Sequence, residues 1–172
     1  MIRYEIAPLH TFADRLDELW AIGSAVNEKI DKEAYPHEHL VEGSRRGDIA
    51  TVAFDGDKII GFCLMTKAEH ILSMGSTIPL KLWLYNNGYD FGRVACSMMI
   101  YVHPDYWEQG LTKSLLAARD GCGFYDWTIH FRPATPQIIE FLEAQPRTVN
   151  TGLLDERGFP ILIRDIRGET SE

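Results

Sequence analysis

The chain has 172 residues, of which 45% are hydrophobic and 24% are charged, and its formal net charge is -8 at pH 7. This length suits one domain with a substantial core, so a single domain over residues 1–172 is expected. The negative charge argues against general nucleic-acid binding, which normally needs a basic surface, and favours an amine-bearing partner.

The cysteines and the N-terminal sequence indicate in which cellular compartment the protein is expected. The three cysteines, Cys63, Cys96 and Cys122, form neither a CxxC pair nor a zinc-binding spacing, so reduced thiols are expected. His37 and His39 have no further ligands at a suitable spacing, and no metal site is predicted. The chain has no signal-like N-terminus and no run of about 18 apolar residues. These features predict a cytoplasmic protein with no membrane partner.

The first part of the chain predicts a strand, two helices and a hairpin. Residues 2–8 have the alternation of a strand. From Thr11 the apolar positions recur at three- and four-residue steps, which indicates a helix. Residues 32–47 predict a loop and a short helix. Residues 49–54 and 58–67 are strand-like and flank an Asp-Gly turn, which predicts a hairpin.

The second part predicts strands and helices in alternation. Residues 94–102 form a continuous apolar run, as expected of a strand buried on both faces. A helix is expected over 110–119 and a strand over 127–131. Residues 135–145 predict another helix, with Thr135 as its N-cap.

The rest of the chain comprises one irregular stretch before these elements, and a strand pair and a short tail after them. Residues 68–92 carry several aromatic side chains and an Asn-Asn-Gly turn, and we interpret them as an insertion or lid on the acceptor side; the alternative is a loop packed on the sheet. A strand pair is expected over 149–154 and 159–165. Residues 168–172 are expected to be a disordered tail.

The order of these elements resembles that of the GNAT acetyltransferase superfamily. The resemblance is most specific over residues 100–116, IYVHPDYWEQGLTKSLL, where a hydrophobic strand leads into a turn similar to the family pattern V-x-P-x-x-R-G-x-G-x-G and then into a helix. Trp107 stands at the position of the family's arginine, and Thr112 at that of its last glycine. The resemblance implies an α/β (mixed α+β) fold, with a central twisted sheet of about six or seven strands and about four helices.

The same resemblance implies an acyl-CoA cofactor, with acetyl-CoA as the default. Main-chain N–H groups at a helix N-terminus have no partner within the helix and carry the positive end of its dipole, so they suit a pyrophosphate. On the family pattern, the edge of the strand at Ile100, Tyr101 and Val102 would pair with pantetheine. The residues expected to hold the pyrophosphate are Gln109, Gly110, Leu111, Thr112 and Lys113.

Acyl transfer to an amine needs a neutral acceptor and a proton source for the departing thiolate. Many family members use a helical tyrosine as the acid, but the corresponding position here is Phe141, which cannot donate a proton. Each remaining candidate also has a structural interpretation, as a core aromatic, a satisfied core histidine or an ordinary loop residue. The catalytic candidates are Tyr101, Ser97, His103 and His130, and Glu69 with His70 are candidates for the acceptor side.

Three functions follow from the resemblance. The first is an acyl-CoA-dependent N-acetyltransferase that acts on an amine of a small molecule or a protein. The second is a non-catalytic GNAT-like binding or structural protein, and the third is a GNAT-like nucleobase-modifying enzyme, against which the acidic charge argues. A homodimer formed through the C-terminal strand pair is a further expectation.

Overall fold

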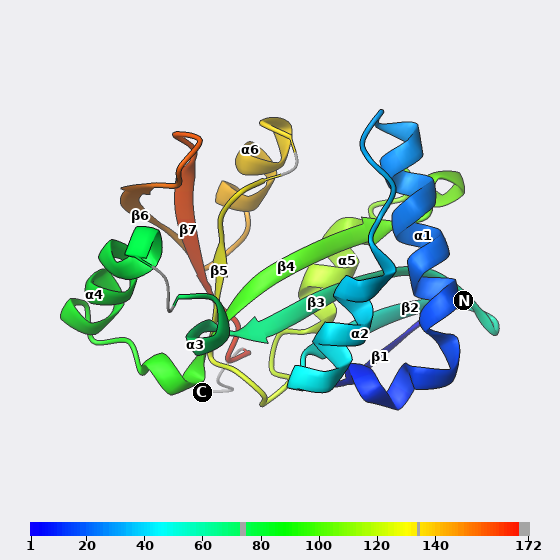
Figure 1. The fold of residues 1–172 in the computed structure, drawn as a ribbon, viewed down its shortest axis with the longest axis horizontal. Helices are drawn as coiled ribbons and strands as arrows, with labels where there is room; N and C mark the ends of the chain where they lie inside the picture. Colours follow the sequence, from blue (N-terminus) through cyan, green and yellow to red (C-terminus); the bar gives the residue numbers. More distant parts are fainter. Residues whose placement is uncertain (73–74, 134, 169–172) are drawn as a thin grey trace. The chain divides into compact units, whose positions relative to one another are not determined.

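The computed structural model describes residues 1–72, 75–133 and 135–168. Its strands form one mixed sheet in the order β1-β2-β3-β4-β5-β7-β6 (Figure 1). The strands are β1 (Ile2–Pro8), β2 (Ile49–Asp55), β3 (Lys58–Lys67), β4 (Val94–Val102), β5 (Trp127–His130), β6 (Thr148–Leu154) and β7 (Pro160–Asp165). The α-helices are α1 (Leu16–Lys29), α2 (His37–Arg46), α3 (Ala68–Ile71), α4 (Ile78–Asn86), α5 (Leu111–Ala118) and α6 (Gln137–Glu143). This confirms the mixed-sheet fold, and the described residues contain more helices than the expected four because α3 and α4 lie within residues 68–92.

The chain divides into two compact units, and β4 contributes to both. The first unit comprises residues 1–65 and 98–120, and the second comprises residues 66–97 and the remainder from 121. The second half of β4 therefore belongs to the first unit and its first half to the second unit. The turn that the sequence predicts to hold the cofactor, residues 109–113 (the cofactor turn), lies wholly within the first unit.

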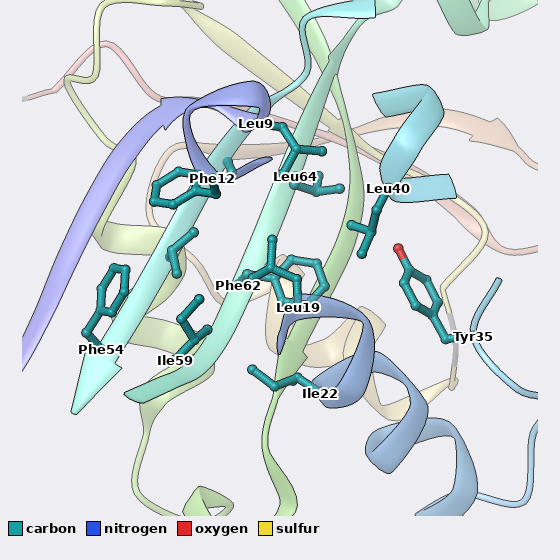
Figure 2. Close-up of a cluster of buried hydrophobic side chains, with 12 residues drawn as sticks. Leu9, Phe12, Leu19, Ile22, Tyr35, Leu40, Phe54, Ile59, Phe62 and Leu64 are labelled. Carbon is teal, nitrogen blue, oxygen red and sulfur yellow. The ribbon is translucent and has the colours of Figure 1, made fainter. Parts of the chain in front are cut away.

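In the first unit, helices cover both faces of the strands. Strands β2 and β3 form the expected hairpin, and Gly56 adopts a φ of 60° in its turn, which suits a residue without a Cβ. Figure 1 shows α1 and α2 on one face of these strands and α5 on the other. Alternate side chains of each strand point to opposite faces, so each face has its own apolar cluster. The larger one, which includes Leu19 of α1, Leu40 of α2 and Phe62 of β3, is drawn in Figure 2.

The predicted start of the first helix at Thr11 was wrong. Residues Leu9–Arg15 form a 3-10 helix, and α1 begins only at Leu16. The backbone kinks at Phe12, which has a non-helical φ of -103° and ψ of 24°, and both Leu9 and Phe12 are buried in the core. The N–H of Leu9 also donates to the carbonyl of Asp48 at 2.7 Å, which fixes the chain at that point.

The loop between α1 and α2 is held in place by two aromatic residues, Tyr35 in the loop and Trp20 in α1. The ring of Tyr35 packs on Gly23, where a Cβ would lie 2.8 Å from the ring carbon Cδ1. The indole Nε1 of Trp20 donates to the Tyr35 carbonyl at 2.7 Å, although Trp20 remains 38% exposed. The close packing of Tyr35 on Gly23 and the hydrogen bond from Trp20 together keep the loop against α1.

In the second unit, β5 is the central strand. It pairs in parallel with Val94–Cys96 of β4 and antiparallel with β7, and β7 pairs with β6. The predicted burial of β4 on both faces holds for Val94–Cys96, the residues paired with β5, whereas residues 97–101 are half-buried. Helix α6 begins at Gln137, with Pro136 already helical in backbone conformation, and no side-chain cap is present, so the predicted Thr135 cap was wrong.

The described part of residues 68–92 is largely helical, with short α3 followed by the apolar helix α4. Leu80 and Leu84 of α4 are buried, while Ile78, Leu82 and Tyr85 are exposed. Of the expected tail over 168–172, residues 169–172 lie outside the described residues. Among those that are described, no helix is both long and apolar enough to cross a membrane.

Candidate functional site

The end of β4 is fixed by hydrogen bonds within the first unit. The N–H of His103 donates to the carbonyl of Ile60 in β3 at 2.8 Å. The Nδ1 of His103 accepts the N–H of Asp105 at 3.2 Å and so caps the short 3-10 helix Pro104–Tyr106. Because this nitrogen serves as an acceptor, Nε2 of the neutral His103 ring carries the hydrogen and is a donor.

Tyr106 ties the next segment to the β2–β3 hairpin. Its hydroxyl donates to Oδ2 of Asp55 at 2.8 Å, and this hydrogen bond raises the pKa of Tyr106. The ammonium of Lys58 lies 5.6 Å from the centre of the Tyr106 ring, within the range of a cation–π contact. The chain between β4 and the cofactor turn is thus held by its neighbours before the turn begins.

Two residues at the cofactor turn lie in the left-handed region. Trp107 is extended, with φ -61° and ψ 156°, and its indole Nε1 donates to the carbonyl of Val102 at 2.7 Å. Glu108 has a φ of 68° and Gly110 a φ of 72°. Glycine adopts this conformation without strain, whereas a residue with a Cβ does not. A Cβ at Gly110 would meet no atom within 4 Å, so the space beside it is open.

The first turn of α5 presents main-chain donors. The first hydrogen bond of the helix joins the N–H of Ser114 to the carbonyl of Gly110 at 3.2 Å. In the part of the chain that the structure describes, no acceptor is recorded for the N–H groups of residues 109–113. Leu111 is buried in an apolar cluster with Val102 and Leu115, which anchors the helix start. The anchored helix start can therefore present several N–H groups to one anion.

Gly61 of β3 allows α5 to approach the sheet closely. A Cβ at this position would lie 3.0 Å from the Tyr101 carbonyl oxygen and 3.2 Å from Cδ1 of Leu115. Both contacts are closer than ordinary van der Waals distance. The absent side chain at Gly61 thus helps to set the position of α5 beneath β4.

The charge of the turn is balanced rather than basic. Glu108 and Lys113 are both exposed, and within the described ranges neither has a recorded ion pair. One negative and one positive side chain near the donors leave the field of the main-chain N–H groups as the main attraction for an anion.

Tyr101 lies in an aromatic cluster of the first unit. Its ring centre is 5.4 Å from that of Tyr35 and 5.7 Å from that of Phe62. Burial raises the pKa of Tyr101, and a hydrogen bond with Asn27 partly offsets this effect. The phenol is protonated at neutral pH, as an ordinary tyrosine is, and its burial makes it harder to ionise.

The other two catalytic candidates belong to the second unit. Ser97 is half-buried in β4, and it makes an interaction within the protein. His130 is buried in β5, with 5% of its surface exposed, and its Nε2 lies 3.5 Å from Oγ1 of Thr128. The structure therefore gathers Tyr101 and His103 with the turn in one unit, and it describes Ser97 and His130 separately.

A pocket in the second unit joins the helical segment 75–86 to the ends of β5 and β6. Its volume is about 180 Å³. Apolar walls come from Pro79, Leu80 and Leu153, and the rim carries the ion pair between Arg132 and Glu156. The described part of the segment interpreted as an insertion or lid thus lines a pocket of mixed apolar and charged character. Glu69, by contrast, is exposed in α3.

Comparisons with known proteins identify the family. A search of curated protein sequences finds no match. The model of the acetyltransferase (GNAT) family matches residues 13–119. The chain belongs to this family. The matched residues include the strand, the turn and the helix described above, so the GNAT assignment rests on the segment that carries the candidate site.

Solved structures share the GNAT fold at low sequence identity. An acetyltransferase from Thermus thermophilus is 17% identical, with a TM-score of 0.57, over 94% of this chain and 96% of that one. Tetrahymena GCN5 is 14% identical, with a TM-score of 0.62, over 99% of both chains. The ribosomal-protein-S18-alanine N-acetyltransferase of Escherichia coli is 13% identical, with a TM-score of 0.54, over 99% of this chain and 98% of that one. At these identities the likeness shows the fold alone.

Sequence reasoning missed two features of this turn. One is the left-handed backbone of Glu108, which the family pattern signals because a glycine stands at that position. The other is the hydrogen bond from Trp107 to Val102, for which the sequence offers no signal because it depends on how the turn folds back.

Proposed function

We propose that this GNAT protein is an acetyl-CoA-dependent N-acetyltransferase that acts on an amine of a small molecule or a protein. The observation that carries the proposal is the set of main-chain N–H groups over residues 109–113, next to the open space at Gly110. A row of unpaired donors at a helix start suits the pyrophosphate of a coenzyme A thioester.

Each residue of the site would have a distinct part in holding the donor. The N–H groups of Gln109, Gly110, Leu111, Thr112 and Lys113 would bind the pyrophosphate, and the Lys113 ammonium would add a positive charge. The main chain of Ile100, Tyr101 and Val102 would pair with pantetheine. The carbonyl of Val102 already accepts the Trp107 indole, so its N–H is the group left for this pairing.

When bound, acetyl-CoA would supply the acyl group for transfer to the acceptor nitrogen, with the CoA thiolate as the leaving group. The chain must then take a proton from the amine and give one to the departing thiolate. Tyr101 is our candidate for the acid, because its phenol carries a proton at neutral pH and its residue lies on the strand expected to pair with pantetheine. Ser97, His103 and His130 are the candidates for orienting or deprotonating the amine. Because Nδ1 of His103 accepts the N–H of Asp105, Nε2 of the neutral ring carries the hydrogen, and in this geometry His103 would orient an acceptor as a donor.

The pocket lined by α4 and β6 is our candidate for the acceptor. Its apolar walls would hold the body of a small amine or a side chain. Its lining includes two carboxylates, Asp155 and Glu156, against one guanidinium, Arg132, so its net charge would attract a cation. The net charge of -8 favours amine-bearing over acidic acceptors. A homodimer through β6 and a cytoplasmic location complete the proposal.

Thermal unfolding with and without acetyl-CoA tests cofactor binding. At about one hundred times its dissociation constant the ligand should stabilise the protein by about 2.7 kcal/mol, seen as a higher Tm. Gly110→Trp would fill the open space and abolish this shift. Gly56→Trp is the matched control, because Gly56 also has a positive φ and open space but lies in the hairpin turn. No shift for the native chain at millimolar acetyl-CoA would refute the proposal.

A second candidate function is binding without turnover. It is favoured by Phe141 in α6, at the position where the family resemblance implies a tyrosine acid. Thiol release from acetyl-CoA, measured over a panel of amines, separates the two functions. A Tm shift without any thiol release would favour the binding protein.

A further inference from the structure

We propose that Trp107 is a positioning residue that holds the cofactor turn in its donor-presenting shape through the Val102 carbonyl. This inference rests on the proposed acetyl-CoA site, which it deepens. It concerns how the turn is held when the family's arginine and first glycine are both absent from it.

The segment around the turn is held unevenly. The residues before it have several fixed points: His103 is joined to Ile60, Tyr106 to Asp55, and the N–H of Trp107 to the Pro104 carbonyl at 3.2 Å. Over residues 108 and 109 no side-chain hydrogen bond is recorded in the described structure, and at Gly110 the carbonyl accepts the Ser114 hydroxyl at 3.3 Å. The indole of Trp107 is therefore the last fixed point before the donors.

Glu108 makes such a fixed point necessary. Its φ of 68° is disfavoured for any residue with a Cβ, so an unrestrained chain would relax toward a negative φ. That change at Glu108 would rotate the peptide that follows and redirect the N–H of Gln109. The bond from Trp107 to the end of β4 opposes this relaxation, because it fixes the residue directly before Glu108.

Trp20 provides a matched control for the indole hydrogen bond. Both tryptophans are 38% exposed, and both donate Nε1 to a main-chain carbonyl at 2.7 Å. The acceptor of Trp20 is Tyr35, in the loop between α1 and α2. Replacing either tryptophan by phenylalanine removes the same donor and keeps a ring, so the two variants differ chiefly in location.

The first measurement needs no cofactor. Backbone order parameters from nitrogen-15 relaxation should be near 0.85 for Gln109 and Gly110 in the unmodified chain and below about 0.6 in Trp107→Phe. Trp20→Phe should leave them unchanged. An equally rigid turn in Trp107→Phe would overturn the positioning role, whether or not the protein binds acetyl-CoA.

The second measurement concerns binding and turnover. The dissociation constant of CoA, by calorimetry, should rise about three- to tenfold in Trp107→Phe and stay the same in Trp20→Phe. The KM for acetyl-CoA should rise with little change in kcat. Tighter CoA binding by Trp107→Phe would also overturn the proposal, because the indole would then compete with the ligand. Absence of CoA binding by the unmodified chain would refute the proposed function, while the order parameters would still decide the role of Trp107.

Discussion

The phenol of Tyr35 donates a hydrogen bond to the sulfur of Met99, with 2.6 Å between the two atoms. A residue of the loop after α1 is thereby joined to the half of β4 that belongs to the first unit. Tyr35 is only 4% exposed, so this bond lies in the interior, next to the Tyr101 ring. The loop and the strand that carries the candidate acid are coupled through one pair of side chains.

Removing this hydroxyl should destabilise the first unit modestly. Tyr35→Phe should lower the free energy of unfolding by about 0.5–1.5 kcal/mol, because a buried hydrogen bond is lost while the ring remains. Urea denaturation provides the measurement. In a cycle with Met99→Leu the two effects should be less than additive; full additivity would show that the bond contributes nothing.

Alkaline pH should weaken the fold through the same tyrosine. Burial raises the pKa of Tyr35 above the usual value of 10.0, so the folded state resists ionisation that the unfolded state allows. The corresponding stability is fully present below pH 10 and is lost as pH rises through the higher folded pKa. The unfolding free energy should therefore fall above pH 10, and less steeply in Tyr35→Phe. Equal slopes for the two proteins would contradict this assignment.

Replacing Glu108 by glycine should improve both stability and cofactor binding. The change relieves a left-handed residue, and we expect a gain of about 0.5–1 kcal/mol in unfolding free energy. It also removes a negative charge beside the proposed pyrophosphate, so CoA should bind more tightly. Asp31→Gly is the control: Asp31 has a φ of 56° in the first unit and should give a similar gain in stability without any effect on CoA.

Gly61→Ala should disturb the position of α5. Its new Cβ would press on the Tyr101 carbonyl and on Leu115, at a cost of about 1–3 kcal/mol. Gly92→Ala is a suitable comparison, because its Cβ would meet only Asp90 at 3.5 Å, an ordinary contact. If both variants unfolded at the same urea concentration, close packing at Gly61 would not matter to stability.

Thiol chemistry should distinguish the cysteines. Cys63 and Cys96 are buried, and burial raises the pKa of Cys63 and raises that of Cys96 to about 12. Cys122 is partly exposed. A colorimetric thiol reagent at pH 8 should therefore modify Cys122 alone in the folded protein and all three residues in denaturant. Rapid modification of a second thiol in the folded state would contradict the burial.

The sequence predicted the elements that depend on local pattern. The hairpin around Gly56 and the apolar run of β4 were located closely because turn chemistry and hydrophobicity specify them directly. The start of α1 was misplaced because tertiary packing of Leu9 and Phe12 selects a 3-10 helix there. The expected roles of the site residues remain predictions, since they depend on a bound donor and acceptor.

One of the two strands at the ends of the sheet order, β6, is kinked by its own side chains. Its register with β7 shifts between Asn150 and Leu154, Gly152 has a φ of 78°, and the Thr151 hydroxyl donates to the Ile161 carbonyl at 2.8 Å. A strand interrupted in this way can pair with a second copy over a short stretch, but it offers no long straight template for the repeated pairing of a fibril. Although Val149 and Leu154 are exposed, concentrated protein should resist fibril formation seeded at this edge, and straightening β6 should be the quickest route to aggregation.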